Sequence, residues 1–326
     1  MHFVGNLNVA TCLLVFTWFE GVTASPLSDE VADILAQRFS AAVLLTDSEA
    51  IEFGVGSFNP NDIVNTNNEN LGSDQALAER KNKSLYLLPY KRTVDSSSSK
   101  GAHILSLRAY SLRTKSEFSL FDDSGAKDVL DEAILGWAVG YGYRYKWNEN
   151  FSVTSKINNH FMHYSNQFSA NSIQSESIEV FFDGSLFNTS AWSTIVEPSV
   201  RFEYDVPVAW GDWALASTWS YFRGYAWGHA NQGHISEPMG WYVTNQLTWS
   251  RDYFDGSSTP FIGLKRVDLS KDLQSELSTN HYYEMSVGWL FNNPVDLDWV
   301  ENVGVGINLN YGSSLRGGSI SLYYNK

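Results

Sequence analysis

The feature that most constrains the fold is a strict alternation of large apolar residues with glycine and small residues in the stretch AILGWAVGYGYRYKW. Successive side chains of a β-strand point to opposite faces, so a period of two predicts a strand. A soluble sheet would place polar residues on its second face, whereas glycine weakens a strand and offers little to water. In a transmembrane barrel the bulky face contacts lipid and the other face lines the lumen. The bulky positions are Leu135, Trp137, Val139, Tyr141, Tyr143, Tyr145 and Trp147.

The same alternation recurs along the chain, often with Trp or Tyr at the ends of a run, as the aromatic girdles of a membrane barrel require. Its sharpest instance lies at 196–206, where apolar residues alternate with polar and charged ones. Twelve strands are predicted, at 49–58, 84–94, 103–112, 132–147, 150–164, 192–206, 211–226, 238–252, 258–267, 280–291, 300–311 and 316–325.

The predicted connections between these strands alternate between long and short. Bacterial barrels have short periplasmic turns, longer external loops and an even strand number. The predicted fold class is therefore all-β, a transmembrane antiparallel β-barrel of about 12 strands with a short N-terminal helix. Residues 177–187, SIEVFFDGSLF, are interpreted either as a further strand or as a hairpin above the membrane.

The N-terminal region carries one apolar run, VATCLLVFTWF, which is shorter than the roughly 20 residues of a spanning helix. The small residues VTA at 22–24 then suit a cleavage site, so residues 1–24 are predicted to be a signal peptide. The single Cys12 lies inside it, and the mature chain would contain no disulfide. Residues 25–48 are predicted to be a periplasmic segment, and 49–326 to be the barrel.

The segment SDEVADILAQRF, residues 28–39, has apolar residues at helical spacing, with Ser28 as a plausible N-cap. We predict an amphipathic helix at the periplasmic mouth of the barrel. Two interpretations are open. The helix is either a plug in the lumen, or a short element that is packed under the barrel or loosely ordered.

The net charge of −14 argues against nucleic acid as a partner, because its binding needs a basic patch. No nucleotide or phosphate-loop motif is present, and we predict no cofactor and no metal site. Seven charged or titratable residues are predicted to line the lumen, where they either shape a pore or neutralise one another. They are Lys156, His160, Glu197, Arg201, Glu203, Asp205 and Glu284.

A short helix before a twelve-stranded barrel, with stretches such as EFGVGSFNPND and LYLLPYKRTV, resembles the solitary autotransporter-like β-barrels of the Gram-negative outer membrane. The resemblance implies a location in the outer membrane, with outer-membrane lipids and lipopolysaccharide as neighbours. The final strand, with Gly318, Ile320, Leu322 and Tyr324, is similar to the signal read by the barrel assembly machinery. That machinery is the expected partner during insertion.

One short motif suggests chemistry. HYSNQ, residues 163–167, resembles the H-x-S-N element of outer-membrane lipid A deacylases and phospholipase A, in which the His is general base to a Ser nucleophile. His163 and Ser165 share a strand face, and Glu176 or Glu179 would have to orient the imidazole. The alternative is that these are ordinary polar residues at the end of a strand.

The sequence therefore predicts a non-enzymatic integral barrel that serves as a surface interaction protein or as a narrow channel. The alternative function is an outer-membrane lipid hydrolase of the serine type that uses His163 and Ser165. The two are separated by geometry, because a hydrolase needs the imidazole within reach of the hydroxyl and an acid or amide behind it.

Overall fold

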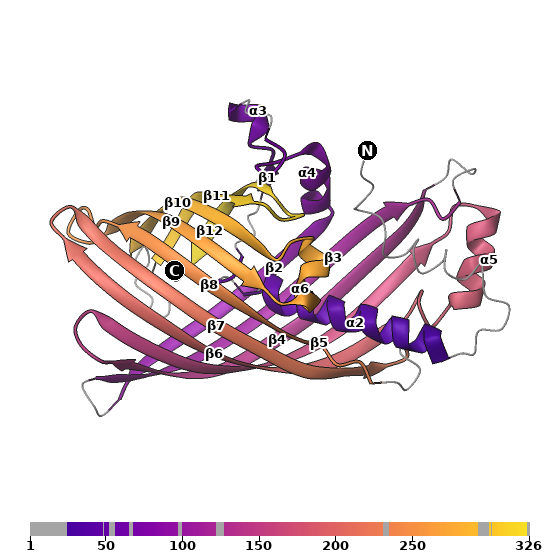
Figure 1. Cartoon of the computed structure of the whole chain (residues 1–326), viewed down its shortest axis with the longest axis horizontal. Helices are drawn as coiled ribbons and strands as arrows, with labels where there is room; N and C mark the ends of the chain where they lie inside the picture. The colour runs from indigo at the N-terminus through magenta and orange to yellow at the C-terminus, as the bar shows by residue number, and fades with distance from the viewer. Residues whose placement is uncertain are drawn as a thin grey trace.

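The computed structural model describes residues 25–47, 49–51, 56–64, 68–96, 100–121, 127–230, 235–292, 300 and 302–324. Within these residues, twelve antiparallel strands form one sheet that curls around a helix (Figure 1). The strands are β1 (Gly56–Phe58), β2 (Lys83–Asp95), β3 (Gly101–Phe118), β4 (Asp128–Lys146), β5 (Phe151–Ser169), β6 (Ser190–Val208), β7 (Gly211–Gly228), β8 (Met239–Ser250), β9 (Ser258–Leu269), β10 (His281–Asn292), β11 (Asn302–Tyr311) and β12 (Gly317–Tyr324).

The strand number and the fold class predicted from the alternation are confirmed. Consecutive strands from β2 to β12 pair with one another, and β1 pairs with β12. Inner-face side chains from strands far apart in the sheet order, such as Tyr110 of β3 and Tyr282 of β10, belong to one buried cluster. The sheet is therefore curled into a barrel with a filled interior.

The glycine face of β4 has a steric cause. A Cβ on Gly136 would lie 2.5 Å from the ring of Tyr110, and a Cβ on Gly140 would lie 2.1 Å from the side-chain oxygen of Asn158. These two side chains come from the neighbouring strands β3 and β5 and lie over the inner face of β4. Glycine is needed at both positions because larger lumen residues already occupy the space.

The two ends of the barrel differ. One end, here called the turn end, carries the short connections, such as 147–150 and 209–210. The opposite end, called the loop end, carries the long connections and four short helices, of which α5 stands out in Figure 1. These helices are α3 (Asn61–Val64), α4 (Asp74–Lys81), α5 (Ile173–Phe182) and α6 (Lys271–Leu277). Among the helices that are described, none is both long and apolar enough to cross a membrane.

Helix α2 (Ser25–Leu45) is longer than the predicted helix, and its predicted place at the mouth with the short turns is wrong. The carbonyl of Ala32 accepts a hydrogen bond from Ser236, and Gln37 accepts one from Ser275, both from loop-end connections. The helix then descends into the lumen, and every side chain from Phe39 to Thr46 is buried. Of the two interpretations of this segment, the structure shows the one inside the barrel.

Two further predictions are wrong. Residues 177–187 are neither strand nor hairpin, because most of α5 lies there and Phe182 packs with Phe168 and Phe187. The predicted first strand at 49–58 is reduced to Gly56–Phe58, while 49–51 form part of a turn inside the lumen and 52–55 lie outside the described residues.

Helix α4 lies between the two edges of the sheet and contacts both edge strands, β1 and β2. Arg80 of α4, just before β2, donates a hydrogen bond to the carbonyl of Leu315, just before β12. Burial lowers the pKa of the Arg80 guanidinium to about 10. Among the described residues no backbone pairing joins β1 to β2, so this contact is one of those that bring the edges together.

Candidate functional site

The seven residues predicted to line the lumen all lie on the inner face of their strands. Their register follows from the pairing of Asn158 with Glu197 and of Lys156 with Ser199, which fixes the inward positions of β5 and β6. Asp205 is exposed near the turn end, whereas His160, Glu197 and Glu284 are buried. Lys265 donates to Glu284 over 3.0 Å, so that carboxylate is neutralised by a neighbour.

Glu197 is the centre of a buried polar network at mid-lumen. Its Oε2 lies 2.9 Å from His160 Nε2, accepts from Asn158 Nδ2 over 2.9 Å, and is 3.6 Å from Arg108 Nη2. Its second oxygen accepts a short hydrogen bond from the hydroxyl of Tyr242. Four strands, β3, β5, β6 and β8, therefore converge on one carboxylate.

The turn that follows α2 is held by this network. Tyr242 OH also contacts Asp47 Oδ2 at 2.6 Å, and Arg108 donates to the carbonyl of Thr46 over 2.9 Å. Arg108 lies 3.7 Å from the Asp47 carboxylate as well. Because the same Arg and Tyr contact both the wall and the N-terminal segment, the segment is fixed to the wall of the lumen.

Closer to the turn end, Glu49 continues the attachment. Its Oε2 is 3.4 Å from Arg201 Nη1 and accepts from Thr218 over 3.3 Å. Arg201 also donates to Glu203 over 3.0 Å. Five of the seven predicted lumen residues, namely His160, Glu197, Arg201, Glu203 and Glu284, are thus paired with one another, with other lumen residues or with the N-terminal segment, as intramembrane charges usually are.

Above the network, toward the loop end, the lumen is filled by apolar packing. Val31, Leu35 and Phe39 of α2 are buried in a cluster with inner-face residues of most strands and with Leu273 and Leu277 of α6. The ring of Phe39 meets that of Tyr164 edge to face, with centroids 6.2 Å apart. Together, the apolar cluster and the polar network fill the lumen at these two levels.

His163 and Ser165 of the HYSN motif lie elsewhere, on the outward face of β5 near the loop end, whereas Tyr164 and Asn166 face the lumen. The ring of His163 packs on Trp192 with centroids 4.5 Å apart. Among the described residues, no hydrogen bond joins His163 to Ser165, and no carboxylate lies within hydrogen-bond distance of its imidazole. The structure places the two residues on one face, as the period of two predicts, without forming a nucleophile–base pair.

The two acids proposed to orient His163 are on helix α5. Glu179 accepts a hydrogen bond over 3.1 Å from Asn188, and so acts within the connection between β5 and β6. Glu176 is exposed in the first turn of α5. Neither acid is brought to the imidazole, and within the described residues no group of three His, Cys, Asp or Glu side chains is arranged to hold a metal ion.

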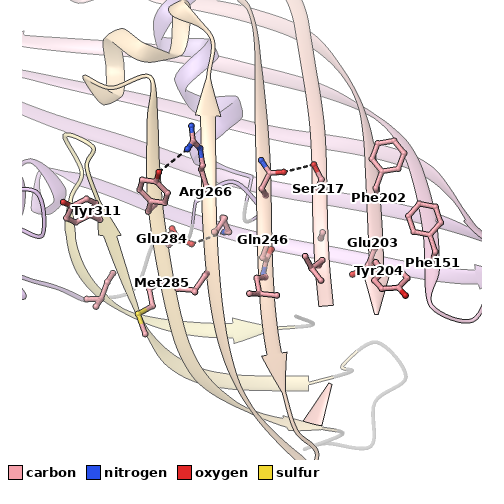
Figure 2. Close-up of a pocket in the computed structure, with 18 of the residues that line it drawn as sticks. Phe151, Phe202, Glu203, Tyr204, Ser217, Gln246, Arg266, Glu284, Met285 and Tyr311 are labelled. Carbon is pink, nitrogen blue, oxygen red and sulfur yellow. Dashed lines mark hydrogen bonds and ion pairs between the residues drawn. The ribbon is translucent and has the colours of Figure 1, made fainter. Parts of the chain in front are cut away.

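A shallow hollow of about 690 Å³ lies over β5 to β11 (Figure 2). Many of its lining side chains are outward-facing and apolar, such as Tyr204, Leu215 and Met285. Ser217 hydrogen-bonds to Asn245 over 2.9 Å, and Arg266 to Tyr283 over 3.2 Å, in one row across these strands. The hollow contains none of the four predicted catalytic residues, and its apolar lining suits hydrocarbon chains.

The residues that attach the N-terminal segment to the wall of the lumen were not predicted from the sequence. Asp47, Glu49, Arg108 and Tyr242 were not predicted to act together, since they are distant in the chain. The sequence does contain one indication that the N-terminal segment is enclosed. The run FSAAVLL at 39–45 is apolar or small on all sides, which indicates a helix enclosed on every side, and acids follow it directly.

The model of one protein family, described as the solitary outer membrane autotransporter beta-barrel domain, matches residues 36–326. No curated protein matches the chain. Among solved structures, the transport unit of AIDA-I from Escherichia coli is 11% identical with a TM-score of 0.48, covering 75% of this chain and 83% of that one. The translocator domain of NalP from Neisseria meningitidis is 9% identical with a TM-score of 0.39, covering 74% and 85%. The toluene transporter TodX from Pseudomonas putida is 7% identical with a TM-score of 0.35, covering 74% and 77%.

Proposed function

We propose a function from the premise that this chain belongs to the family of solitary outer-membrane autotransporter β-barrels, and so lies in the outer membrane. The protein serves there as a closed barrel that presents an interaction surface at its loop end. The conduction of solutes through a narrow channel is the second candidate. The mutual neutralisation of charges around Glu197 favours the first.

The observation that carries this proposal is that Arg108 and Tyr242 both hold the N-terminal segment against the wall of the lumen. Each contacts Asp47 of the N-terminal segment and Glu197 of the wall. Removing one partner of a buried ion pair leaves an uncompensated charge in a medium of low dielectric constant, which is strongly unfavourable. Withdrawal of the segment would take Asp47 and the Thr46 carbonyl away from Arg108 and leave Glu197 as its one remaining partner in this network, which favours the closed state.

The structure of the loop end supports the proposed interaction surface. Long connections of outer-membrane barrels face the outside, and loops carry interaction residues more often than the wall does. Here helix α5 projects at that end with Ile173, Val180 and Phe181 exposed. A soluble partner or a second membrane protein would meet these side chains first.

Conductance in planar lipid bilayers tests the closed state. Purified wild-type protein should insert without steady conductance, whereas the double variant Arg108→Gln/Tyr242→Phe should give intermittent openings, because Arg108 and Tyr242 supply the contacts that hold Thr46 and Asp47. The control Tyr225→Phe changes an outward residue and should behave like wild type. Steady conductance of the wild-type protein would contradict the closed barrel and favour the channel.

Cysteine labelling of intact cells tests which end is outside. Glu176→Cys on α5 should react with an impermeant maleimide, whereas Glu149→Cys in the turn between β4 and β5 should react only after the outer membrane is permeabilised. Both positions are exposed, so access rather than burial decides the result. The reverse pattern would place the loop end in the periplasm and remove the surface role.

A further inference from the structure

A second concavity, of about 970 Å³, lies on the outer wall near the loop end and takes in the serine of the HYSN motif. One row of residues directly opposite each other forms its floor: Arg113 on β3, Ala133 on β4, Ser165 on β5 and Ser190 on β6. His229, which follows β7, continues the lining. This set of residues is called the wall groove below.

The groove is hollow because, beyond Arg113, its floor consists of the small side chains of Ala133, Ser165 and Ser190 between rows of larger ones. The next row toward the turn end contains Leu135, His163, Trp192 and Trp227. On the other side stand Gln167 and the connection 184–189 that follows α5. Alanine and serine between such neighbours leave a slot that crosses several strands.

The polar groups of the slot are available to a ligand. In the described part of the chain, the structure gives no side-chain hydrogen bond to Ser165, Gln167, Ser190 or His229. Arg113 donates to Asp131 over 2.7 Å, so the cation at this end of the groove is already neutralised by an acid. Small-molecule sites typically have volumes of about 300–1,000 Å³ and a few convergent polar groups. The groove therefore suits a neutral, hydroxyl-rich group better than a free phosphate.

The level of the groove in the membrane narrows the class of ligand further. Trp192 and Trp227 form an aromatic row directly beneath it, and Trp137 and Phe161 stack at 4.5 Å in the row below that. Aromatic girdles lie at the level of the lipid headgroups. A polar slot just above such a row faces the headgroup region, with aromatic rings on its membrane side.

We propose that the wall groove binds the saccharide headgroup of an outer-leaflet glycolipid. The apolar faces of a sugar ring pack against His163 and Trp192, and its hydroxyls pair with Ser165, Gln167 and Ser190. The inference deepens the proposed function by naming a partner, and it rests on that function in placing the loop end outside. It also gives His163 and Ser165 of the HYSN motif a binding role that does not require a hydrogen bond between them.

The test measures lipid binding to the purified barrel by native mass spectrometry. The probes are a lipopolysaccharide with a short sugar core and phosphatidylglycerol, and the free core oligosaccharide serves as competitor. Ser165→Leu fills the floor of the groove with a branched apolar side chain. The matched control is Ser155→Leu, a serine on the same outward face of β5 near the turn end. Heat-modifiable gel mobility checks that each variant is folded.

Wild type and Ser155→Leu should retain the lipopolysaccharide in preference to phosphatidylglycerol, and free oligosaccharide should compete. Ser165→Leu should weaken retention by about tenfold, equivalent to about 1.4 kcal/mol. Equal retention by the two leucine variants, equal binding of phosphatidylglycerol, or no competition by the sugar would each overturn the proposal. Because bilayer conductance does not depend on this binding, a failure here is distinguishable from a failure of the closed barrel.

Discussion

The two faces of strand β5 use similar residues in opposite ways. On the inner face, Asn158 and His160 bind Glu197 and so help to fix the N-terminal segment in the lumen. On the outer face, His163 touches an indole ring and Ser165 has no side-chain hydrogen bond among the described residues. Polar groups that hydrogen-bond to one another stabilise the fold, whereas polar groups without such partners are available to bind a ligand. We therefore expect substitutions in the lumen to affect stability and substitutions on the outer wall near Ser165 to affect binding.

The largest expected effect is that of removing the carboxylate at the centre of the lumen. Glu197→Ala removes the carboxylate that His160 contacts and one of the two carboxylates beside Arg108, and should lower the free energy of unfolding by about 3–5 kcal/mol. Equilibrium urea unfolding of the protein in lipid vesicles measures this change.

The control for this substitution is Glu203→Ala, on the same face of β6. Glu203 is only half-buried and pairs with Arg201, so its removal should cost about 0–1 kcal/mol. If both substitutions have similar effects, the network around Glu197 does not hold the closed state.

A charge placed on the lipid side should have the next largest effect. Val287 faces outward halfway along β10, between Ile262 and Ile307. Val287→Arg should cost about 2–4 kcal/mol near the bilayer midplane. The same urea unfolding assay applies.

The matched inner-face change is Ala214→Arg, opposite Asp205 across the β6–β7 pair. Its cost should be close to zero because the new cation meets a carboxylate at the exposed turn end. A larger loss for Ala214→Arg than for Val287→Arg would reverse the assignment of the two faces.

The strand pattern was predictable because it depends on local periodicity. Trp137, Val287 and their neighbours alternate wherever lipid lies on one side, and eleven of the predicted strands coincide with β2–β12 to within a few residues. The extensions of β3 to β5 were missed, since their loop-end residues, such as Lys115 and Gln167, are polar on the outward face and leave the hydrophobic pattern.

The helices were harder to predict because tertiary packing decides them. Ile178, Val180 and Phe181 favour a strand by propensity, yet Ser172 caps a helix there and Phe182 anchors it. The place of α2 depends on contacts such as Arg108 with Thr46, separated by 62 residues. Periodicity within one segment contains no information about such pairs.

A smaller effect distinguishes the hydroxyl of a buried tyrosine from that of an exposed one. Tyr242→Phe removes the group that bridges Asp47 and Glu197 and should cost about 1–3 kcal/mol, as expected for loss of a buried hydrogen bond. Tyr225→Phe, on the outward face of β7, should change the stability by no more than about 0.5 kcal/mol. Equal values from urea unfolding would mean that the bridge adds nothing to the attachment of the segment.

The smallest expected effect is that of Ser165→Ala. The substitution removes an outward hydroxyl that makes no side-chain hydrogen bond among the described residues, so the unfolding free energy should change by no more than about 0.5 kcal/mol. Wild type and variant should both release no fatty acid from lipid A or phospholipid, with or without divalent cations, because His163 packs on Trp192 and is not oriented by an acid. Acyl release by folded wild-type protein that Ser165→Ala abolishes would restore the hydrolase, and would mean that the outer wall, rather than the lumen, carries the chemistry of this barrel.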